Sequence, residues 1–199
     1  KIVIPTPALY AQFRNIYDIN RIFTALKRVG FNEIMEISRA SEFVLENTVE
    51  YLKRENIKTP VISASCPTIT RLIEMRFPSL IENVSPVIIP IDAVIRAANK
   101  RADDLVNSCN IKREEIGIFY ITPCGSLGTR ARGMKENGKP LINGVIALDE
   151  MYLRLRAIIR NLDESEIENL AQSCGRGIQK AATGGERAYI GLENSISVD

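Results

Sequence analysis

Residues 116–134 have the sequence IGIFYITPCGSLGTRARGM, which joins a strand signal to residues that can carry chemistry. The first six residues are mostly β-branched or aromatic, and this predicts a buried strand over residues 116–121. Cys124 follows that strand and precedes a run rich in glycine and hydroxyl groups. Ligands bind at the carboxyl ends of strands in open α/β sheets. The stretch therefore predicts an α/β fold with Cys124 at a candidate site.

The same succession of strand and helix recurs along the whole chain. Strands are predicted at residues 2–4, 33–37, 61–63, 116–121 and 144–147, and helices at 18–29, 41–52, 67–75, 91–106, 149–159 and 163–170. This order is typical of parallel α/β proteins. Because the rhythm occurs twice around the long helix 91–106, we expect two lobes with parallel sheets flanked by helices. The first lobe is residues 1–112 and the second is 113–199.

The composition is that of an ordinary globular protein. The chain has 199 residues, 45% of them hydrophobic, and a formal net charge of +2. This charge gives no case for nucleic-acid or membrane partners, and the apolar runs are too short to span a bilayer. Without a signal-peptide pattern, the expected compartment is the cytoplasm. The chain starts without Met and ends without a tail, so we expect a fragment of a longer protein.

The cysteines and the missing histidines restrict the possible chemistry. Cysteines occur at positions 66, 109, 124 and 174, and the chain has no histidine. Catalysis by Ser-His or Cys-His pairs is therefore excluded, and zinc-finger spacing is not present. In the cytoplasm, free thiols are expected.

Two of the cysteines occupy matching places. Cys66 and Cys124 each follow a predicted strand and each adjoin a proline, so two meeting lobes would bring both thiols to one cleft. Position alone leaves open whether they are ligands or small core residues. For Cys109 and Cys174 we expect the structural role of a buried core residue.

A phosphate loop is the alternative for Cys124. The spacing from Cys124 to Arg130 is Cys-x5-Arg, in which backbone amides and the guanidinium could hold a phosphate, as in a phosphatase. Such an enzyme needs a general acid, and Asp149 is the nearest candidate in the sequence. This hypothesis leaves Cys66 unexplained and is the less favoured one.

Several motifs, in one order along the chain, resemble the active-site domain of the iron-only ([FeFe]) hydrogenase large subunit. The segment SASCPTITRLIEMRFPSLIENVS at 63–85 resembles the family's Thr-Ser-Cys-Cys-Pro motif, and YITPCGSL at 120–127 resembles its Met-Pro-Cys-x-x-Lys motif. The flanking segments VIPTPALYAQF, PVIIPIDAVIRAANK, INGVIALDEMYLRL and AATGGERAYI resemble the family at the expected places.

The resemblance implies a [4Fe–4S] cluster between two lobes. Cys66 and Cys124 would be two of its four thiolate ligands, which suit a soft iron–sulfur cluster. The family's other two ligands lie in a third motif, further along than Asp199. We therefore expect the cluster in the full-length protein but not in this fragment alone. Pro7 and Ala8 would line the pocket beside it.

The chain departs from the family at four pocket positions. Ser65 replaces a proton-relay cysteine, and Leu127 replaces a lysine that holds a cyanide of the diiron subsite. Arg130 replaces a glutamate of the proton path, and Ile91 replaces a glutamine of the middle helix. Each change removes a donor, an acid or a proton carrier, so no diiron subsite is expected.

The resemblance therefore implies a cluster-binding domain with a redox-sensing, signalling or electron-relay role, without hydrogen turnover. Hydrogenase-like domains of this sort occur in anaerobic bacteria. The implied partners are ferredoxin-like and signalling domains of the same longer chain. An active iron-only hydrogenase, a scaffold for cluster assembly and the Cys-x5-Arg phosphatase are the alternatives.

Overall fold

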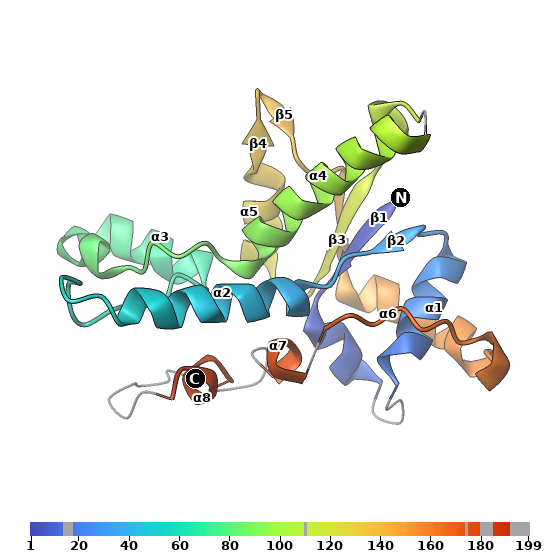
Figure 1. Ribbon diagram of the computed structural model, residues 1–199, viewed down its shortest axis with the longest axis horizontal. Helices are drawn as coiled ribbons and strands as arrows, with labels where there is room; N and C mark the ends of the chain where they lie inside the picture. The colour runs from blue at the N-terminus through green and yellow to red at the C-terminus, as the bar shows by residue number, and fades with distance from the viewer. Residues whose placement is uncertain (14–17, 110, 174, 180–184, 192–199) are drawn as a thin grey trace.

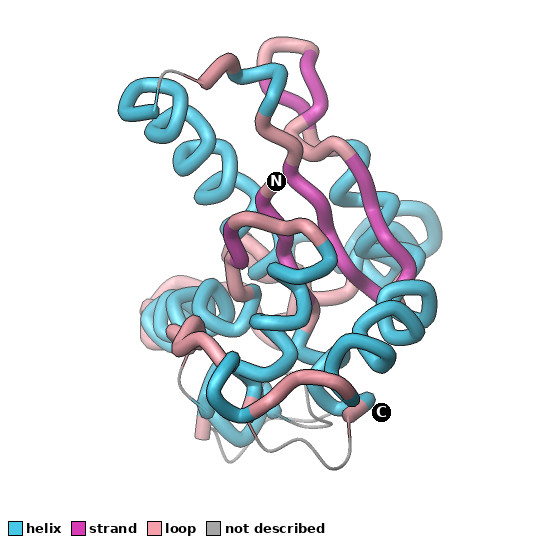
Figure 2. Tube along the Cα trace, turned by 90° about the vertical axis from the view of Figure 1, so that its right-hand side faces the viewer, coloured by secondary structure: helices cyan, strands magenta, loops and turns pink. Residues whose placement is uncertain are grey.

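A four-stranded parallel sheet forms the centre of the computed structural model, which describes residues 1–13, 18–109, 111–173, 175–179 and 185–191. The strand order is β2-β1-β3-β6, where β1 is Ile2–Pro5, β2 is Glu33–Ile34, β3 is Ile118–Thr122 and β6 is Gly144–Ala147. Figure 2 shows the strands side by side with helices around them. The expected parallel α/β fold is confirmed.

Helices flank the sheet, in the order and with the bounds that follow. They are η1 (Pro7–Gln12), α1 (Ile19–Val29), α2 (Ile37–Leu52), α3 (Pro67–Arg76), η2 (Pro78–Asn83), α4 (Pro90–Cys109), η3 (Arg113–Glu115), α5 (Gly125–Gly133), α6 (Leu148–Arg160), η4 (Glu164–Glu166), α7 (Gly175–Gln179) and α8 (Gly185–Ile190). Strands β4 (Lys135–Glu136) and β5 (Lys139–Pro140) form a separate hairpin. Figure 1 shows their arrangement. In the described part of the chain, no helix is both long and apolar enough to cross a membrane.

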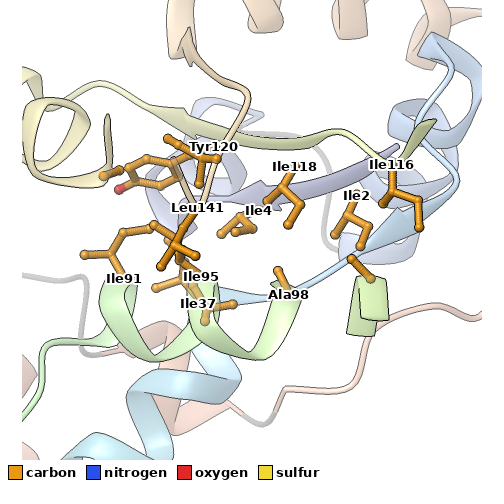
Figure 3. Close-up of a cluster of buried hydrophobic side chains, with 14 of the residues drawn as sticks. Ile2, Ile4, Ile37, Ile91, Ile95, Ala98, Ile116, Ile118, Tyr120 and Leu141 are labelled. Carbon is orange, nitrogen blue, oxygen red and sulfur yellow. The ribbon is translucent and has the colours of Figure 1, made fainter. Parts of the chain in front are cut away.

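The alternation of side chains along the strands separates two hydrophobic cores. Ile2 and Ile4 of β1 lie in one core and Val3 lies in the other, as the period of two in a strand requires. The first core packs the sheet against α4, whose Ile95 and Ala98 face β1 and β3 (Figure 3). The second core packs it against α1 and α6. The molecule is therefore a three-layer sandwich with the sheet in the middle.

The ends of α1 follow from its sequence. The side chain of Asp18 accepts a hydrogen bond from the backbone N–H of Asn20 and so caps the first turn. At the other end Gly30 has a φ of 112°, a left-handed conformation that glycine adopts without strain. These two caps confirm the predicted helix at 18–29.

Two predicted elements are wrong. Residues 61–63 form no strand of the sheet, because Ile62 makes only an isolated parallel bridge with Val84. The predicted helix at 163–170 is a single 3-10 turn, Glu164–Glu166. After that turn the backbone N–H groups of Glu168 and Leu170 donate to Thr24 and Asn20 of α1, so they are not available for helical hydrogen bonds.

The expected division into lobes at residue 112 stays a prediction. Two strands of the sheet come from residues 1–112 and two from residues 113–199, and β1 pairs directly with β3 along its full length. Strands from both expected lobes therefore share one sheet.

Candidate functional site

Cys124 lies just beyond the carboxyl end of β3, as predicted. Strand β1, which lies beside β3, ends at Pro5, and Pro5 pairs with Ile121 of β3 in the parallel register. The backbone N–H of Thr6 donates to the carbonyl of Ile121 over 3.2 Å, so the chain leaving β1 stays beside the chain leaving β3. The predicted pocket residues Pro7 and Ala8 therefore emerge at the same edge of the sheet as Cys124.

The thiol of Cys124 is held at the start of a helix. Cys124 is the N-cap of α5, and its own N–H donates to Thr122 Oγ1 over 3.1 Å. Its Sγ lies 3.2 Å from Ser126 Oγ. Burial raises the pKa of this thiol, but the hydrogen bond with Ser126 and the backbone N–H groups of Leu127 and Ser126 outweigh burial and lower it. The start of α5 therefore favours the thiolate, the form that binds metals.

Cys66 lies at the start of a helix, as Cys124 does. The strand that was predicted before Cys66 does not form. Cys66 is the N-cap of α3, and Pro67 occupies the first helical position, where its missing N–H costs nothing. The backbone angles of Cys66 are φ −106° and ψ 108°, and those of Cys124 are φ −97° and ψ 114°. The two cysteines thus share a helix N-cap conformation, and α3 packs against α5.

Both thiols are free. Cys66 is exposed and Cys124 is half-buried, and neither forms a disulfide. Within the described ranges, no three His, Cys, Asp or Glu residues come together as a metal site. The described residues therefore offer two free thiols, one at the start of each helix, and no complete ligand set.

The remaining predicted pocket residues lie on α4, on α5 and in the segment before α3. Ser65 directly precedes Cys66 and is half-buried, and Leu127 packs on the first hydrophobic core from α5. Ile91 is 3% exposed and belongs to that core, so its side chain is a packing element. Arg130 extends from α5 to Asp92 of α4 and donates to both of its carboxylate oxygens. These hydrogen bonds raise the pKa of Arg130.

Sequence reasoning missed two acidic residues of this region. Asp92 is 8% exposed and binds Arg130, and Glu186 of α8 accepts a hydrogen bond from Ser65 Oγ over 3.0 Å. Asp92 carried a signal, because it adjoins the predicted pocket position Ile91 in the middle helix. Nothing in the local sequence connects Glu186 with Ser65, because 121 residues separate them.

The prediction for Cys109 is wrong, and that for Cys174 stays open. Cys109 is exposed at the end of α4, and its Sγ lies 3.5 Å from Ser108 Oγ. The helix ends there and turns this side chain away from the core. Cys174 lies outside the described residues.

The position of Arg130 argues against a phosphate loop at Cys124. The backbone N–H groups of Ser126 and Leu127 at the start of α5 could face an anion, as helix N-termini do. A phosphate loop also needs a free arginine as its clamp. The guanidinium of Arg130 is engaged by Asp92, so the Cys-x5-Arg spacing lacks that clamp in this structure.

By its fold, the chain is a parallel α/β domain. Two of its free cysteines lie at the N-termini of helices that pack against each other. The profile of a family described as iron only hydrogenase large subunit, C-terminal domain, matches residues 1–195. The chain belongs to this family.

Curated relatives agree with the family. The chain is 25% identical over 202 residues to iron hydrogenase 1 of Clostridium pasteurianum, a match that covers 92% of this chain and 34% of that protein. It is also 25% identical over 142 residues to the NADP-reducing hydrogenase subunit HndD of Solidesulfovibrio fructosivorans, covering 66% of this chain and 24% of that protein. The chain thus spans about a third of the length of the first relative and about a quarter of the length of the second.

Solved structures share the fold. A variant of the apo [FeFe]-hydrogenase HydA1 from Chlamydomonas reinhardtii superposes with a TM-score of 0.60 at 20% identity, over 93% of this chain and 52% of that one. A structure described as showing stepwise H-cluster assembly in HydA gives a TM-score of 0.56 at 19% identity, over 92% of this chain and 53% of that one. The chain covers about half of these structures.

Proposed function

We propose that this chain is a hydrogenase-like domain that binds a [4Fe–4S] cluster through Cys66 and Cys124 and works in redox sensing, signalling or electron relay. The observation that carries the proposal is the pair of free cysteines at matching N-caps of two packed helices, in a chain of the iron-only hydrogenase family. Helix N-termini stabilise thiolates, and thiolates are the ligands of such clusters.

In this proposal Cys66 and Cys124 supply half of a ligand set. A cubane takes four thiolates, and both cysteines are free of disulfides. The remaining two ligands belong, in this proposal, to polypeptide outside residues 1–199, as the resemblance to the family implies. When bound, the cluster supplies one-electron redox chemistry. Residues 1–199 alone would hold no lasting cubane, because two missing ligands expose it to solvent and exchange.

The pocket around the cysteines argues against hydrogen turnover. Leu127 has no hydrogen-bonding group for a ligand of a diiron subsite. Arg130 stays protonated near neutral pH, and both of its bonds to Asp92 fix it away from a relay role. The hydroxyl of Ser65 is a weaker acid than a thiol and already donates to Glu186. Catalytic groups act as a unit, so these changes together would abolish turnover.

The cellular setting is part of the same proposal. A cytoplasmic location suits the two free thiols, because reducing compartments keep cysteines available as ligands. Ferredoxin-like or signalling domains of the same protein would exchange electrons with the cluster or transmit its redox state.

Hydrogen evolution distinguishes this proposal from an active hydrogenase. The natural gene product that contains residues 1–199 is matured with a complete diiron cofactor and assayed with reduced viologen, beside a working iron-only hydrogenase. We expect no turnover above the rate of the unmatured protein. Turnover comparable to that of the working enzyme would overturn the non-catalytic assignment and favour the alternative.

A further inference from the structure

The segment that carries Cys66 has a sparse connection to the rest of the fold. Ile62 is anchored, because its N–H donates to the carbonyl of Asn83 and its carbonyl accepts from the N–H of Ser85, both over 2.8 Å. The next three residues leave this bridge and reach the N-cap of α3 at Cys66. The position of the thiol therefore depends on what holds residues 63–65.

Two serines in this segment form a small hydrogen-bonded unit. Ser63 Oγ lies 2.9 Å from Ser65 Oγ and accepts from the N–H of Ser65 over 3.3 Å. These bonds shape the segment but do not attach it to another element.

Ala64 packs on the first hydrophobic core, and Glu186 adds a polar attachment of the segment to α8. Its Oε2 accepts from Ser65 Oγ over 3.0 Å, and its two carboxylate oxygens lie 3.3 and 3.4 Å from Ser63 Oγ. Hydrogen bonds to an ionised carboxylate are stronger than those between neutral groups. The carboxylate thus accepts from Ser65 and lies within reach of Ser63, whose single hydroxyl hydrogen goes either to it or to Ser65 Oγ.

The helix that carries Glu186 is itself held by the fold. Helix α8 packs against α2 and α7. Its residues Ala188, Tyr189 and Ile190 line, with Glu46 and Val49 of α2, an open hollow of about 700 Å³. A chain of contacts therefore runs from α2 through α8 to the segment before Cys66.

We propose that Glu186 is a positioning residue that fixes the Cys66 segment to α8 through Ser63 and Ser65. The proposal explains why a serine is useful at position 65. A hydroxyl is a good donor to a carboxylate, whereas a thiol at that place is a weak one. The role bears on a cluster only through the proposed function, but the positioning itself needs no iron.

Hydrogen–deuterium exchange of the iron-free chain tests the positioning. In Glu186→Ala, exchange in peptides covering residues 62–66 should rise about fivefold or more, because the segment loses its polar attachment to α8. Peptides from β3 should keep their wild-type rates. Glu186→Gln should lie between wild type and Glu186→Ala, because its amide oxygen still accepts from the serines but without the charge that strengthens these bonds. Arg187→Ala, which changes the exposed neighbour on the same helix, is the matched control.

A double substitution and a measurement on iron complete the test. Ser65→Ala should raise exchange in the same peptides but by less than Glu186→Ala, because Ser63 keeps its contact with the carboxylate. The double variant should add little to Glu186→Ala, because the Ser65–Glu186 bond is already lost there. The proposal is overturned by an unchanged segment in Glu186→Ala, by equal loosening of β3, or by Gln behaving like Ala, which would indicate an effect of charge alone. In the iron-loaded natural gene product, Glu186→Ala should release iron faster than Arg187→Ala. If no variant or wild type binds iron while the exchange result holds, only the proposed function fails.

Discussion

The guanidinium of Arg130 donates two hydrogen bonds to the carboxylate of Asp92, one to each oxygen. Arg130 Nη2 lies 2.6 Å from Asp92 Oδ2 and Nε lies 2.9 Å from Asp92 Oδ1, which joins helix α5 to helix α4. The side chain of Asp92 is 12% exposed and that of Arg130 is 42% exposed. The pair therefore combines a well-buried acid with a base that reaches solvent, and we expect it to stabilise the contact between α4 and α5.

Removal of Arg130 should destabilise the fold. Arg130→Ala leaves the carboxylate of Asp92 buried without this partner, and we expect a loss of about 1–2 kcal/mol of unfolding free energy, a modest value because the arginine is partly exposed. Urea denaturation measures it. Arg132→Ala, at an exposed position of the same helix, should change stability by less than about 0.5 kcal/mol. Equal losses of unfolding free energy in the two variants would show that the Arg130–Asp92 pair does not stabilise the fold.

Two leucines of α6 provide a matched test of the second core. Leu155 is 0% exposed, whereas Leu153 is 66% exposed. Leu155→Ala removes a buried side chain and leaves a cavity, so it should cost about 2–5 kcal/mol. Leu153→Ala should cost less than about 0.5 kcal/mol. Thermal or urea unfolding compares them, and similar losses would contradict the packing of α6 on the sheet.

Strong local patterns were sufficient to predict the framework of the fold. The strand at 144–147 has the predicted bounds, and the predicted helix at 91–106 lies within Pro90–Cys109, because its apolar residues recur at the helical period. The start of α2 was placed four residues late, since Ser41 resembles a cap although it is buried within the helix. Residues 61–63 have β propensity, but a strand also needs a neighbour, which a single sequence does not reveal.

A site residue that directly follows a strand could be predicted from the sequence. The site residues that depend on tertiary contacts could not. Cys124 follows β3 as expected, but no helix was predicted over residues 125–133, where Cys124 is the N-cap of α5. The partners Asp92 and Glu186 lie 38 and 121 residues from Arg130 and Ser65, so only the folded chain brings them together. The exposure of Cys109 likewise depends on where α4 ends.

The thiol of Cys124 should titrate below its ordinary pKa in the iron-free chain. A lowered pKa means that the thiolate, the reactive form, persists to lower pH than in an ordinary cysteine. The midpoint of the alkylation rate against pH, followed by mass spectrometry of the Cys124 peptide, measures this. Ser126→Ala removes the hydrogen bond to Sγ and should raise the midpoint. A midpoint that does not move in this variant would show that Ser126 does not stabilise the thiolate.

Substitution of the cysteines one at a time tests the central claim most directly. Iron is measured in the natural gene product that contains residues 1–199, purified without oxygen, as wild type and as Cys66→Ser, Cys124→Ser and Cys109→Ser. Wild type and Cys109→Ser should both contain about four cluster irons per chain in this domain, since Cys109 lies at the exposed end of α4. Cys66→Ser and Cys124→Ser should each lose most of that iron together with its spectroscopic signature. Full retention of the cluster in both of these variants would contradict the account.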